Sequence, residues 1–422
     1  MPSKKPRRTQ KTILIIANLD TRGSEFKLVK ELIESRGHQG LLLDFSMDRK
    51  PYFPGDITCE EVARAGGLTI REVRHLYRTN RDQATENQIA GARKFVQRLL
   101  EEGKIHGVLG VGGATSAMVA TRIMRSLPLG MPKLMASSIA SHPRYGNRYV
   151  GTKDITMLNT VVDVVELNPI LKIQLTNAVG AICGMVELST GWEPDFDRPV
   201  VAVTSFGMAE RCVEPAIHYL REKGYIAVPC HAQGQGDRAM DEMIREGLFR
   251  GVIDFVPRGI GEELLGGNSP GGNDRLLAAS QCGLPQVVAP SGLEMLGVGG
   301  RPDLLKRYAQ RPRVVIDKLR TLVRTNAREC RRMAAIIAER LNEAQAPCAF
   351  LVPLKGWSFL NKEGRPFYDP RTDRAFVAEL KRRLRPDIPV IEVNAHLNTP
   401  QFGKKAVELF HRLFTQWQQN KK

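Results

Sequence analysis

One short stretch restricts the fold of this chain more than any other: an apolar run that ends in clustered glycines. The run Gly107 to Leu109 leads into the glycine turn Gly110 to Thr115, and Ser116 to Ser126 has the pattern of a helix. A strand, a glycine turn and a helix in this order are typical of open parallel α/β sheets, in which the unpaired amides and dipole of the helix N-terminus favour an anion. The stretch therefore predicts a phosphate-binding turn. Its candidate binding residues are Gly112, Gly113, Ala114, Thr115 and Ser116.

The glycine turn matches the known phosphate motifs in part. Thr115 stands where the third glycine of G-x-G-x-x-G belongs, and no Lys-Ser or Lys-Thr pair follows as in a P-loop. The alternative interpretation is that these glycines form a tight turn and let the helix pack closely on the strand, without any ligand.

A second polar turn follows the first expected strand. Thr12 to Ala17 is uniformly apolar, as a strand covered on both faces should be, and Phe26 to Ile33 repeats apolar residues at helical spacing. The polar residues between them stand at the carboxyl end of the strand, where open α/β sheets bind ligands.

Four residues of this polar turn are candidates for ligand contacts. Asp20 is predicted to hold a magnesium ion or to accept hydrogen bonds from a ligand, with Thr21 and the Gly23 amide beside a phosphate. Arg22 offers a planar cation suited to a phosphate. The alternatives are that Asp20 caps the following helix and that Arg22 touches water alone.

A third polar stretch follows the expected strand Lys133 to Ser137. It is rich in hydroxyl groups and carries a lysine and an aspartate, so we expect it to meet the glycine turn across a ligand crevice; an ordinary surface loop is the alternative. The candidate residues are Ser137, Gly151, Thr152, Lys153 and Asp154. The apolar, glycine-bearing segment Asn159 to Glu187 is predicted to be a helix in a buried or inter-subunit position.

The turn-rich segment Thr190 to Pro199 is the expected domain boundary, because strands and helices alternate afresh after it. The expected strands of the second half are Val200 to Thr204, Tyr225 to Cys230, Val252 to Val256, Pro285 to Ala289, Cys348 to Val352 and Val390 to Val393. The fold class is therefore α/β, with two Rossmann-like open parallel-sheet subdomains in tandem. The expected parts are a disordered basic arm at 1–11, subdomains at 12–190 and 200–418, a linker at 191–199 and a tail at 419–422.

Three candidate acid–base residues follow strands of the second half. His231, Lys355 and His396 lie where α/β enzymes keep such groups, and we take His396 and Lys355 as the catalytic candidates. Arg238 and Arg275 would hold a carboxylate or phosphate of the substrate. No Ser-His-Asp elbow, H-E-x-x-H motif or kinase-like set accompanies them, so a non-catalytic role is the alternative for each.

Composition excludes several classes of protein. No apolar run approaches the roughly 20 residues of a membrane span, and the basic N-terminus lacks a signal-peptide core, so a cytoplasmic protein without a membrane partner is expected. The seven cysteines are scattered, odd in number and free of Cys-x-x-Cys pairs, which favours reduced thiols over a zinc cluster or disulfides.

The chain is strongly basic, with a formal net charge of +17. Such a surface attracts polyanions in a salt-dependent way. The excess is nevertheless diffuse, falls mostly on amphipathic helix patterns and lacks an aromatic-rich stripe. A nucleic-acid partner therefore ranks last among the expectations.

Several phrases, each weak alone, together resemble one family. They are Asp20 to Glu25, the Gly-Val-Gly-Gly of the glycine turn, Val150 to Met157, Val161 to Val164 with Asn168, Arg238 to Met240, Asp274 to Leu276, Pro285 to Val288, Pro366-Phe367 with Asp369-Pro370, and Ala395 to Asn398. They resemble the ATP-binding family of the tomato mosaic virus resistance protein, whose bacterial members are mostly uncharacterised. The resemblance runs from Thr12 to about Phe402.

The resemblance implies two Rossmann-like subdomains, a homodimer, and ATP with Mg2+ bound in the first subdomain. Bacterial relatives are often linked to a barrel domain similar to phosphoenolpyruvate-utilising enzymes; its absence here favours a separate partner protein that carries the barrel. Where the family usually has Gly-Gly-Ser-Gly-Gly-Thr, this chain has Gly112-Gly113-Ala114-Thr115-Ser116-Ala117, which removes two glycines from the turn, and where the family has Asp-Ala-His it has Asn394-Ala395-His396. An amide at Asn394 cannot act as a base or orient His396 as a carboxylate would.

Three functions compete on this evidence. The first is a cytosolic protein that binds a nucleotide, ATP, with magnesium-assisted phosphate binding in the first subdomain. The second is an enzyme that acts on a small anionic metabolite in the second subdomain. The third is a regulatory module that binds a protein or a nucleic acid.

Overall fold

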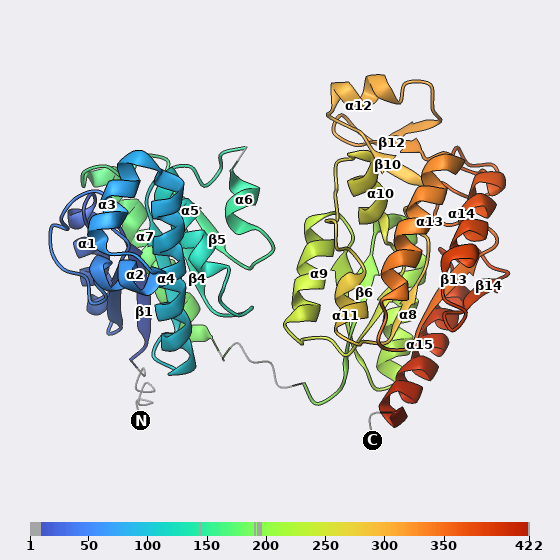
Figure 1. Ribbon diagram of the computed structural model, residues 1–422, viewed down its shortest axis with the longest axis horizontal. Coiled ribbons are helices and arrows are strands. Elements are labelled where there is room, and N and C mark those ends of the chain that lie inside the picture. Colours follow the sequence, from blue (N-terminus) through green and yellow to red (C-terminus); the bar gives the residue numbers. More distant parts are fainter. Residues whose placement is uncertain (1–9, 144, 190, 192–195, 421–422) are drawn as a thin grey trace, which may run out of the picture. The chain divides into compact units, whose positions relative to one another are not determined.

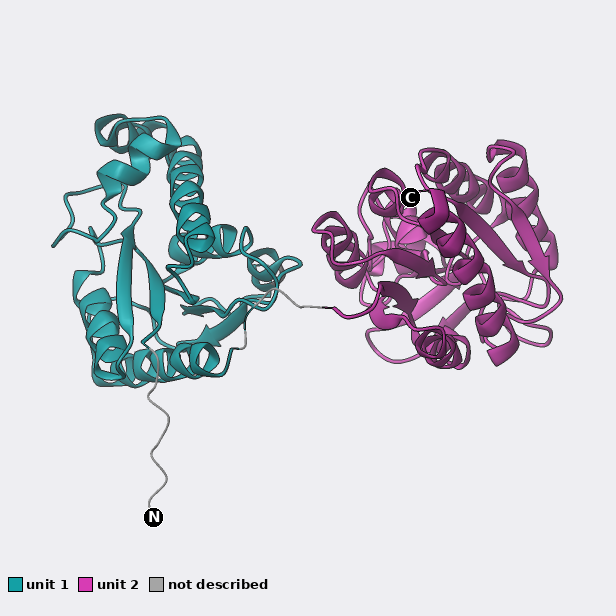
Figure 2. Ribbon diagram, turned by 90° about the horizontal axis from the view of Figure 1, so that it is seen from below, with its two compact units in different colours: residues 1–194 teal, residues 195–422 magenta. Residues whose placement is uncertain are grey.

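The computed structural model describes residues 10–143, 145–189, 191 and 196–420. The chain divides into two compact units, residues 1–194 and 195–422 (Figure 2). Each unit is built around its own parallel sheet with helices on both faces (Figure 1), so the expected α/β class with two Rossmann-like parallel sheets is confirmed.

The first unit contains a five-stranded parallel sheet in the order β2-β1-β3-β4-β5. Its elements are β1 (Thr12–Ala17), α1 (Gly23–Ser35), β2 (Gln39–Asp44), α2 (Cys59–Gly66), α3 (Ile70–Thr79), α4 (Arg81–Glu101), β3 (Gly107–Val111), α5 (Ala114–Met124), β4 (Lys133–Ser137), α6 (Gly146–Val150), β5 (Thr156–Asn159) and α7 (Pro169–Leu188). Along β1 the side chains alternate between two cores: Ile13 and Ile15 pack with residues of α1 and α7, whereas Leu14 and Ile16 pack with residues of α2, α4 and α5. Burial on both faces explains why the strand sequence is uniformly apolar.

Helix α7 is long and apolar enough to cross a membrane by length and composition, and 39% of its most apolar window is buried. Its buried side chains, among them Leu171, Leu175 and Ile182, pack on the sheet of the first unit in the same core as β1. This burial is typical of a helix that covers a sheet. The opposite side of α7 exposes Ile170 and Ile173, which are 55% and 59% accessible.

The second unit contains a six-stranded parallel sheet in the order β14-β13-β9-β8-β6-β7. Its elements up to the third parallel strand are β6 (Val200–Ser205), a 3-10 turn (Gly207–Ala209), α8 (Glu210–Glu222), β7 (Ile226–His231), α9 (Gln235–Arg245) and β8 (Gly251–Asp254). They are followed by α10 (Arg258–Leu265), α11 (Leu277–Gln281), β9 (Gln286–Val288), α13 (Ala327–Asn342), β13 (Cys348–Pro353), α14 (Pro370–Arg383), β14 (Val390–Val393) and α15 (Pro400–Asn420). All six strands of this sheet correspond to strands expected from the sequence.

A small antiparallel sheet was not expected. Between β9 and α13 the chain forms β10 (Met295–Gly297), α12 (Pro302–Arg307), β11 (Arg313–Val315) and β12 (Thr321–Arg324), and the three strands pair in the order β10-β12-β11. In Figure 1 this sheet and α12 lie beyond the ends of α10 and α13. The basic residues from Arg301 onwards therefore lie partly on a β-hairpin, whereas the sequence pattern had indicated helix faces.

Candidate functional site

The sheet of the first unit has a topological switch point between β1 and β3. Strand β1 pairs with β2 on one side and with β3 on the other, and Ile16 lies opposite Gly110 in the second pairing. The loops that follow β1 and β3 therefore leave the sheet in opposite directions and open a crevice at its carboxyl edge. The glycine turn stands at one side of this crevice and the polar turn after β1 at the other.

A pocket of about 250 Å³ lies at this switch point. Its lining residues are Asn18, Asp20, Thr21 and Arg22 after β1, Phe45, Met47 and Asp48 after β2, Tyr77 and Arg81 at the junction of α3 and α4, and Gly113, Ala114, Thr115 and Ser116 at the start of α5. The structure thus brings the candidates from the two polar turns into one pocket. Their role in ligand binding stays a prediction.

Helix α5 presents its first amides without a side-chain cap. Its N-cap residue is Gly113, no side chain accepts from the first turn, and that turn contains no acidic residue. Gly112 has a φ of +141°, and a Cβ at this position would lie 2.5 Å from Ser116 Oγ. The Ser116 hydroxyl donates to Asn18 Oδ1 at 3.4 Å, which joins the glycine turn to the loop after β1. The positive end of the helix dipole is therefore available to an anion.

Arg22 lies over the glycine turn. A Cβ built on Gly112 would be 3.7 Å from Arg22 Nε, and one built on Gly113 would be 4.0 Å from Arg22 Nη2. The Nε atom is buried without a hydrogen-bond partner. Buried guanidinium nitrogens are usually bonded to an acceptor, and Arg22 Nε stands beside the glycine turn without one.

Asp20 is committed mainly to the protein backbone. Its Oδ2 atom accepts hydrogen bonds from the amides of Met47, Asp48 and Arg49 at 3.0–3.3 Å, and the side chain is almost fully buried. The carboxylate therefore fixes the loop after β2 against the loop after β1. Across the described part of the chain, no group of three or more His, Cys, Asp or Glu side chains is arranged to hold a metal ion.

Asp44 holds the base of the same two loops. Its Oδ1 atom accepts from the amides of Leu19 and Ser46 at 3.2 and 3.0 Å, as well as from the Ser46 hydroxyl. Burial raises the pKa of this carboxyl, and the hydrogen bonds from Ser46 and Leu19 oppose that rise. The floor of the pocket is thus held by two carboxylates that bind backbone amides.

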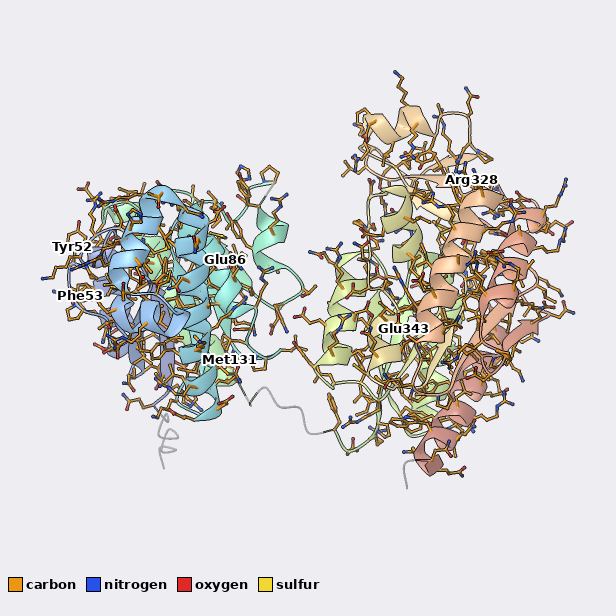
Figure 3. The ribbon with its side chains drawn as sticks, viewed as in Figure 1. Tyr52, Phe53, Glu86, Met131, Arg328 and Glu343 are labelled. Carbon is orange, nitrogen blue, oxygen red and sulfur yellow. The ribbon has the colours of Figure 1, made fainter. Side chains whose placement is uncertain are left out.

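Gly23 allows a close approach of the loop after β2. A Cβ at Gly23 would lie 2.8 Å from the Cβ of Tyr52, a side chain labelled in Figure 3. The Tyr52 amide also donates to the Leu19 carbonyl at 3.1 Å. Gly23 therefore shapes the crevice through packing, and the structure gives no sign that its amide faces the pocket.

Two residues outside the candidate set also meet the glycine turn: Ser138, which belongs to the polar stretch expected there, and Asp163, which sequence reasoning missed. A Cβ on Gly113 would lie 3.8 Å from Asp163 Oδ1 and 3.9 Å from Ser138 Oγ, and the Ser138 hydroxyl donates to Asp163 at 3.1 Å. They follow β5 and β4, so both stand at the carboxyl edge of the sheet. Asp163 belongs to the segment Val161 to Val164, which is part of the family resemblance. This segment is the sequence feature that could have identified Asp163 as a site residue.

The outer wall of the pocket comes from the helical insertion after β2. The Arg81 guanidinium lies 4.4 Å from the centre of the Tyr77 ring and donates to the Tyr77 hydroxyl. Nothing in the sequence pattern distinguished these two residues from an ordinary helix surface, because their place at the pocket depends on how α3 and α4 fold back over the sheet.

The prediction that Gly151 to Asp154 form part of the crevice is wrong. Gly151, Thr152, Lys153 and Asp154 do not meet the glycine turn, because they precede the strand β5 and lie at the amino edge of the sheet. Asp154 pairs there with Lys133, at 2.8 Å, at the start of β4. The sequence pattern predicts a loop over Tyr149 to Thr156 and a helix from Asn159, whereas Thr156–Asn159 forms the edge strand. Ser137 is at the carboxyl edge but fully buried, and its hydroxyl accepts from the Ile139 amide.

In the second unit, His396 and Lys355 line one pocket, as their positions after β14 and β13 suggested. Both ring nitrogens of His396 are engaged by the backbone: Nε2 lies 3.0 Å from the Ser358 carbonyl oxygen, and Nδ1 accepts from the Asn398 amide at 3.1 Å. Burial lowers the pKa of His396. Its catalytic role stays a prediction, and the contacts seen here give it a role in holding two loops together.

Arg275 does not face a ligand. It is 1% exposed and lies among three carboxylates, with Asp237 at 2.9 Å, Asp241 at 3.6 Å and Asp254 in direct contact. The expectation that Arg275 holds a substrate carboxylate or phosphate is therefore wrong. Arg238 is accessible, and its guanidinium lies 3.6 Å from the Glu263 carboxylate.

Comparisons with known proteins agree on one family. The N-terminal domain of the uncharacterised protein family UPF0261 matches residues 11–191, and its C-terminal domain matches residues 198–414. A UPF0261 protein of Clostridium tetani is 34% identical over 409 residues, which cover 95% of this chain and 100% of that protein. The ToMV resistance protein Tm-1 of Solanum lycopersicum is 31% identical over 324 residues, which cover 75% of this chain and 42% of that protein.

Similarity to solved structures is remote. A UDP-N-acetylglucosamine 2-epimerase of Methanocaldococcus jannaschii, in complex with UDP-GlcNAc and UDP, is 8% identical with a TM-score of 0.20; the match covers 95% of this chain and 92% of that one. The S. aureus MnaA–UDP structure is 9% identical with a TM-score of 0.20, and the match covers 66% of this chain and 79% of that one. At these values neither structure bears on the ligand of this chain.

Proposed function

The chain belongs to the uncharacterised protein family UPF0261, and we propose that its first unit binds a nucleotide, ATP, through the phosphate groups. The observation that carries this proposal is the buried, unpartnered guanidinium nitrogen of Arg22 beside the uncapped N-terminus of α5. Both lie in a pocket at the topological switch point, which is where open α/β sheets bind their ligands.

A phosphate fits the chemistry of this pocket. The amides at the start of α5 donate to phosphate oxygens without help from side chains, and the guanidinium of Arg22 adds a bidentate donor. Tyr77 and Arg81 offer an aromatic ring and a second cation at the outer wall. A nucleotide has both parts that such a pocket selects: an anionic chain for the glycine turn and a flat base for the aromatic wall.

Magnesium would reach this site with the nucleotide. Mg2+ keeps several water ligands and commonly takes one or two carboxylates plus phosphate oxygens. Asp48 lines the pocket and Asp163 stands at the glycine turn, whereas Asp20 has one oxygen already occupied by three amides. We therefore favour Asp48 or Asp163 over Asp20 as the carboxylate that approaches a nucleotide-bound Mg2+.

Isothermal titration with ATP, ADP and adenosine, each with and without Mg2+, tests the proposal. Because the phosphates provide most of the contacts, affinity should fall from ATP to ADP and nearly vanish for adenosine. About millimolar ATP should saturate a micromolar site. If ATP at this concentration gives neither heat nor thermal stabilisation, nucleotide binding in the first unit is contradicted.

Replacing Arg22 with alanine should weaken ATP binding by about tenfold, because a charge-assisted hydrogen bond to a phosphate is worth roughly 1.5 kcal/mol or more. Titration calorimetry of the purified variant measures the change. The matched control is Arg71→Ala, since Arg71 is an exposed arginine of the same unit that does not line the pocket. Equal affinity for the Arg22 variant and the wild type would remove Arg22 from the site.

Helix α7 also supports the homodimer that the family resemblance implies. We propose that the exposed apolar residues Ile170 and Ile173, three residues apart on α7, lie at a contact with a second copy of the chain, because such a contact removes their apolar surface from water. Ile173→Glu should shift sedimentation at micromolar concentration toward the monomer, whereas the exposed Gln97→Glu on α4 should not. A wild-type protein that sediments as a monomer throughout contradicts this assembly.

A further inference from the structure

A second pocket, of about 540 Å³, lies at the carboxyl edge of the second sheet. Its walls come from the segment after β6, the segment after β13 and the segment after β14. The charged side chains that line it are Glu210, Arg211, Lys355, Lys362 and Glu363. Parallel α/β sheets bind ligands at this edge, and this pocket is independent of the nucleotide pocket in the first unit.

The cationic side chains of this pocket are available. Within residues 196–420, Arg211, Lys355 and Lys362 take part in no ion pair, and Lys362 lies near the ring of Phe359. The lining carries three cationic side chains and the two carboxylates of Glu210 and Glu363, so its formal charge is +1. Side chains alone therefore make the pocket weakly positive.

Two long helices add to that positive potential. Helices α8 and α15 both begin at the pocket, and their first turns pack side by side: a Cβ on Gly403 would lie 2.4 Å from the Cys212 carbonyl oxygen. No side chain caps the N-terminus of α8, although its first turn carries Glu210, whereas the Thr399 hydroxyl caps α15 by accepting from the Phe402 amide at 3.4 Å. The positive ends of two helix dipoles thus meet at the same wall as Arg211, which favours an anionic group there.

The pocket is held open by a fixed frame. His396 bridges the Ser358 carbonyl and the Asn398 amide, and the Thr399 hydroxyl donates to the His396 carbonyl at 2.7 Å. These bonds tie the loop after β13 to the loop after β14. Asn398 lines the pocket, and its Oδ1 atom is buried without a hydrogen-bond partner.

Behind this frame lie two buried polar side chains, Glu294 and Ser291. Glu294 is fully buried with the Ser358 hydroxyl as its side-chain neighbour, and the Ser291 hydroxyl is buried without a hydrogen-bond partner. Ser358 faces Glu294 and connects it to His396 through the loop after β13. Neither Glu294 nor Ser291 lines the pocket itself.

We propose that this pocket binds a small metabolite carrying a carboxylate or a phosphate group, held by Lys355, Arg211 and the paired N-termini of α8 and α15. The ligand's anionic group would lie against the helix ends, and its remainder would lie toward the His396 frame. The inference concerns a second site and stands independently of nucleotide binding in the first unit.

Lysine labelling of the full-length protein tests this site directly. Lys355 and the exposed reference Lys318 are acetylated at trace level in about 10 mM succinate, about 10 mM inorganic phosphate or chloride at matched ionic strength, and the rates are read by mass spectrometry. Every protein sample also carries the substitution Thr115→Asp, which is meant to prevent anions from binding in the first pocket. We expect at least one of the two anions to slow acetylation of Lys355 about threefold or more while Lys318 is unaffected.

Two variants distinguish a specific anion site at Lys355 from a general effect of salt on lysine acetylation. Arg211→Gln should abolish the protection of Lys355, whereas the control Arg328→Gln, at an exposed arginine of the same unit that does not line the pocket, should leave it intact. Protection by succinate alone assigns a carboxylate ligand, and protection by phosphate alone assigns a phosphate ligand. Equal acetylation of Lys355 in all three salts, or protection that survives Arg211→Gln, overturns the proposal.

Discussion

Replacing Arg275 with methionine is expected to lower the free energy of unfolding of the second unit by about 3–5 kcal/mol, because it leaves buried carboxylates without their cation. Arg275 joins Asp237 and Asp241 of α9 to Asp254 at the end of β8. Asp254 also accepts from the Thr204 hydroxyl, and Asp237 accepts from the Gly234 amide. The loss therefore affects the contact between helix and sheet as well as one ion pair.

The loss of unfolding free energy in the Arg275→Met variant should depend on pH. Burial raises the pKa of Asp241 to about 7, and Arg275 opposes that rise. A carboxyl whose folded pKa exceeds its unfolded value contributes stability that is complete at low pH and is lost as the pH rises through the folded pKa. Without Arg275 the pKa values of these aspartates rise further, so the deficit should be largest near about pH 8 and smaller near about pH 5.

Denaturant unfolding followed by tryptophan fluorescence measures the change, because Trp357 and Trp417 both lie in the second unit. The matched control is Arg340→Met. Arg340 is also partly buried, but it donates to the carbonyl oxygens of Arg275 and Asn273 and joins no carboxylate of this group. A loss of stability for the Arg275 variant that equals the control and does not change with pH would contradict this account.

The sequence predicted the central strands of the parallel sheets because those strands are buried on both faces. Such strands are continuous apolar runs, and the turns that follow them carry the polar residues. Thr12–Ala17 and the glycine turn are clear examples, and the βαβ order brings Arg22 and Thr115 to the same edge of the sheet. Local pattern therefore sufficed to find the main part of this site.

The edge strand β5 could not be predicted in the same way. Thr156–Asn159 is four residues long and only partly buried, so it lacks the apolar run that marks the central strands. Missing it reversed the assignment of the flanking loops: Gly151 to Asp154 precede the strand and Asp163 follows it. One unrecognised short strand thus moved the third polar stretch to the wrong edge of the sheet.

The small antiparallel sheet was missed for a related reason. Its strands have three or four residues, and its hairpin exposes Val315, Ile316 and Leu319 while its cations resemble a solvated helix face. Contacts distant in sequence, between Met295–Gly297 and Thr321–Arg324, define this sheet. Periodicity within a short window contains no information about such pairing.

One departure from the family pattern gains a physical meaning. Ser116, which replaces a glycine of the family, donates to Asn18 and so connects the glycine turn to the polar turn after β1. A glycine there would leave the start of α5 without this link. The substitution therefore favours a crevice fixed in one geometry.

Replacing Thr115 with aspartate should separate ligand binding from stability more sharply than any other change in the first unit. Thr115 is in the first turn of α5, which carries no acidic residue. A carboxylate at that position stabilises the helix through its dipole by about 0.3–1 kcal/mol. The same carboxylate lies where the phosphates of a nucleotide should bind, and repulsion between them should weaken ATP binding by about 30-fold or more.

The neutral, nearly isosteric Thr115→Asn is the control. It should keep most of the affinity for ATP, because an amide does not repel a phosphate, and its melting temperature should stay at or below that of the aspartate variant. Calorimetric titration and thermal unfolding of the two purified variants give both readouts. An aspartate variant that melts at the wild-type temperature or higher but no longer binds ATP is the expected result. Equal ATP affinity in both variants would show that the nucleotide phosphates do not approach the start of α5, and the glycine turn would then serve packing alone.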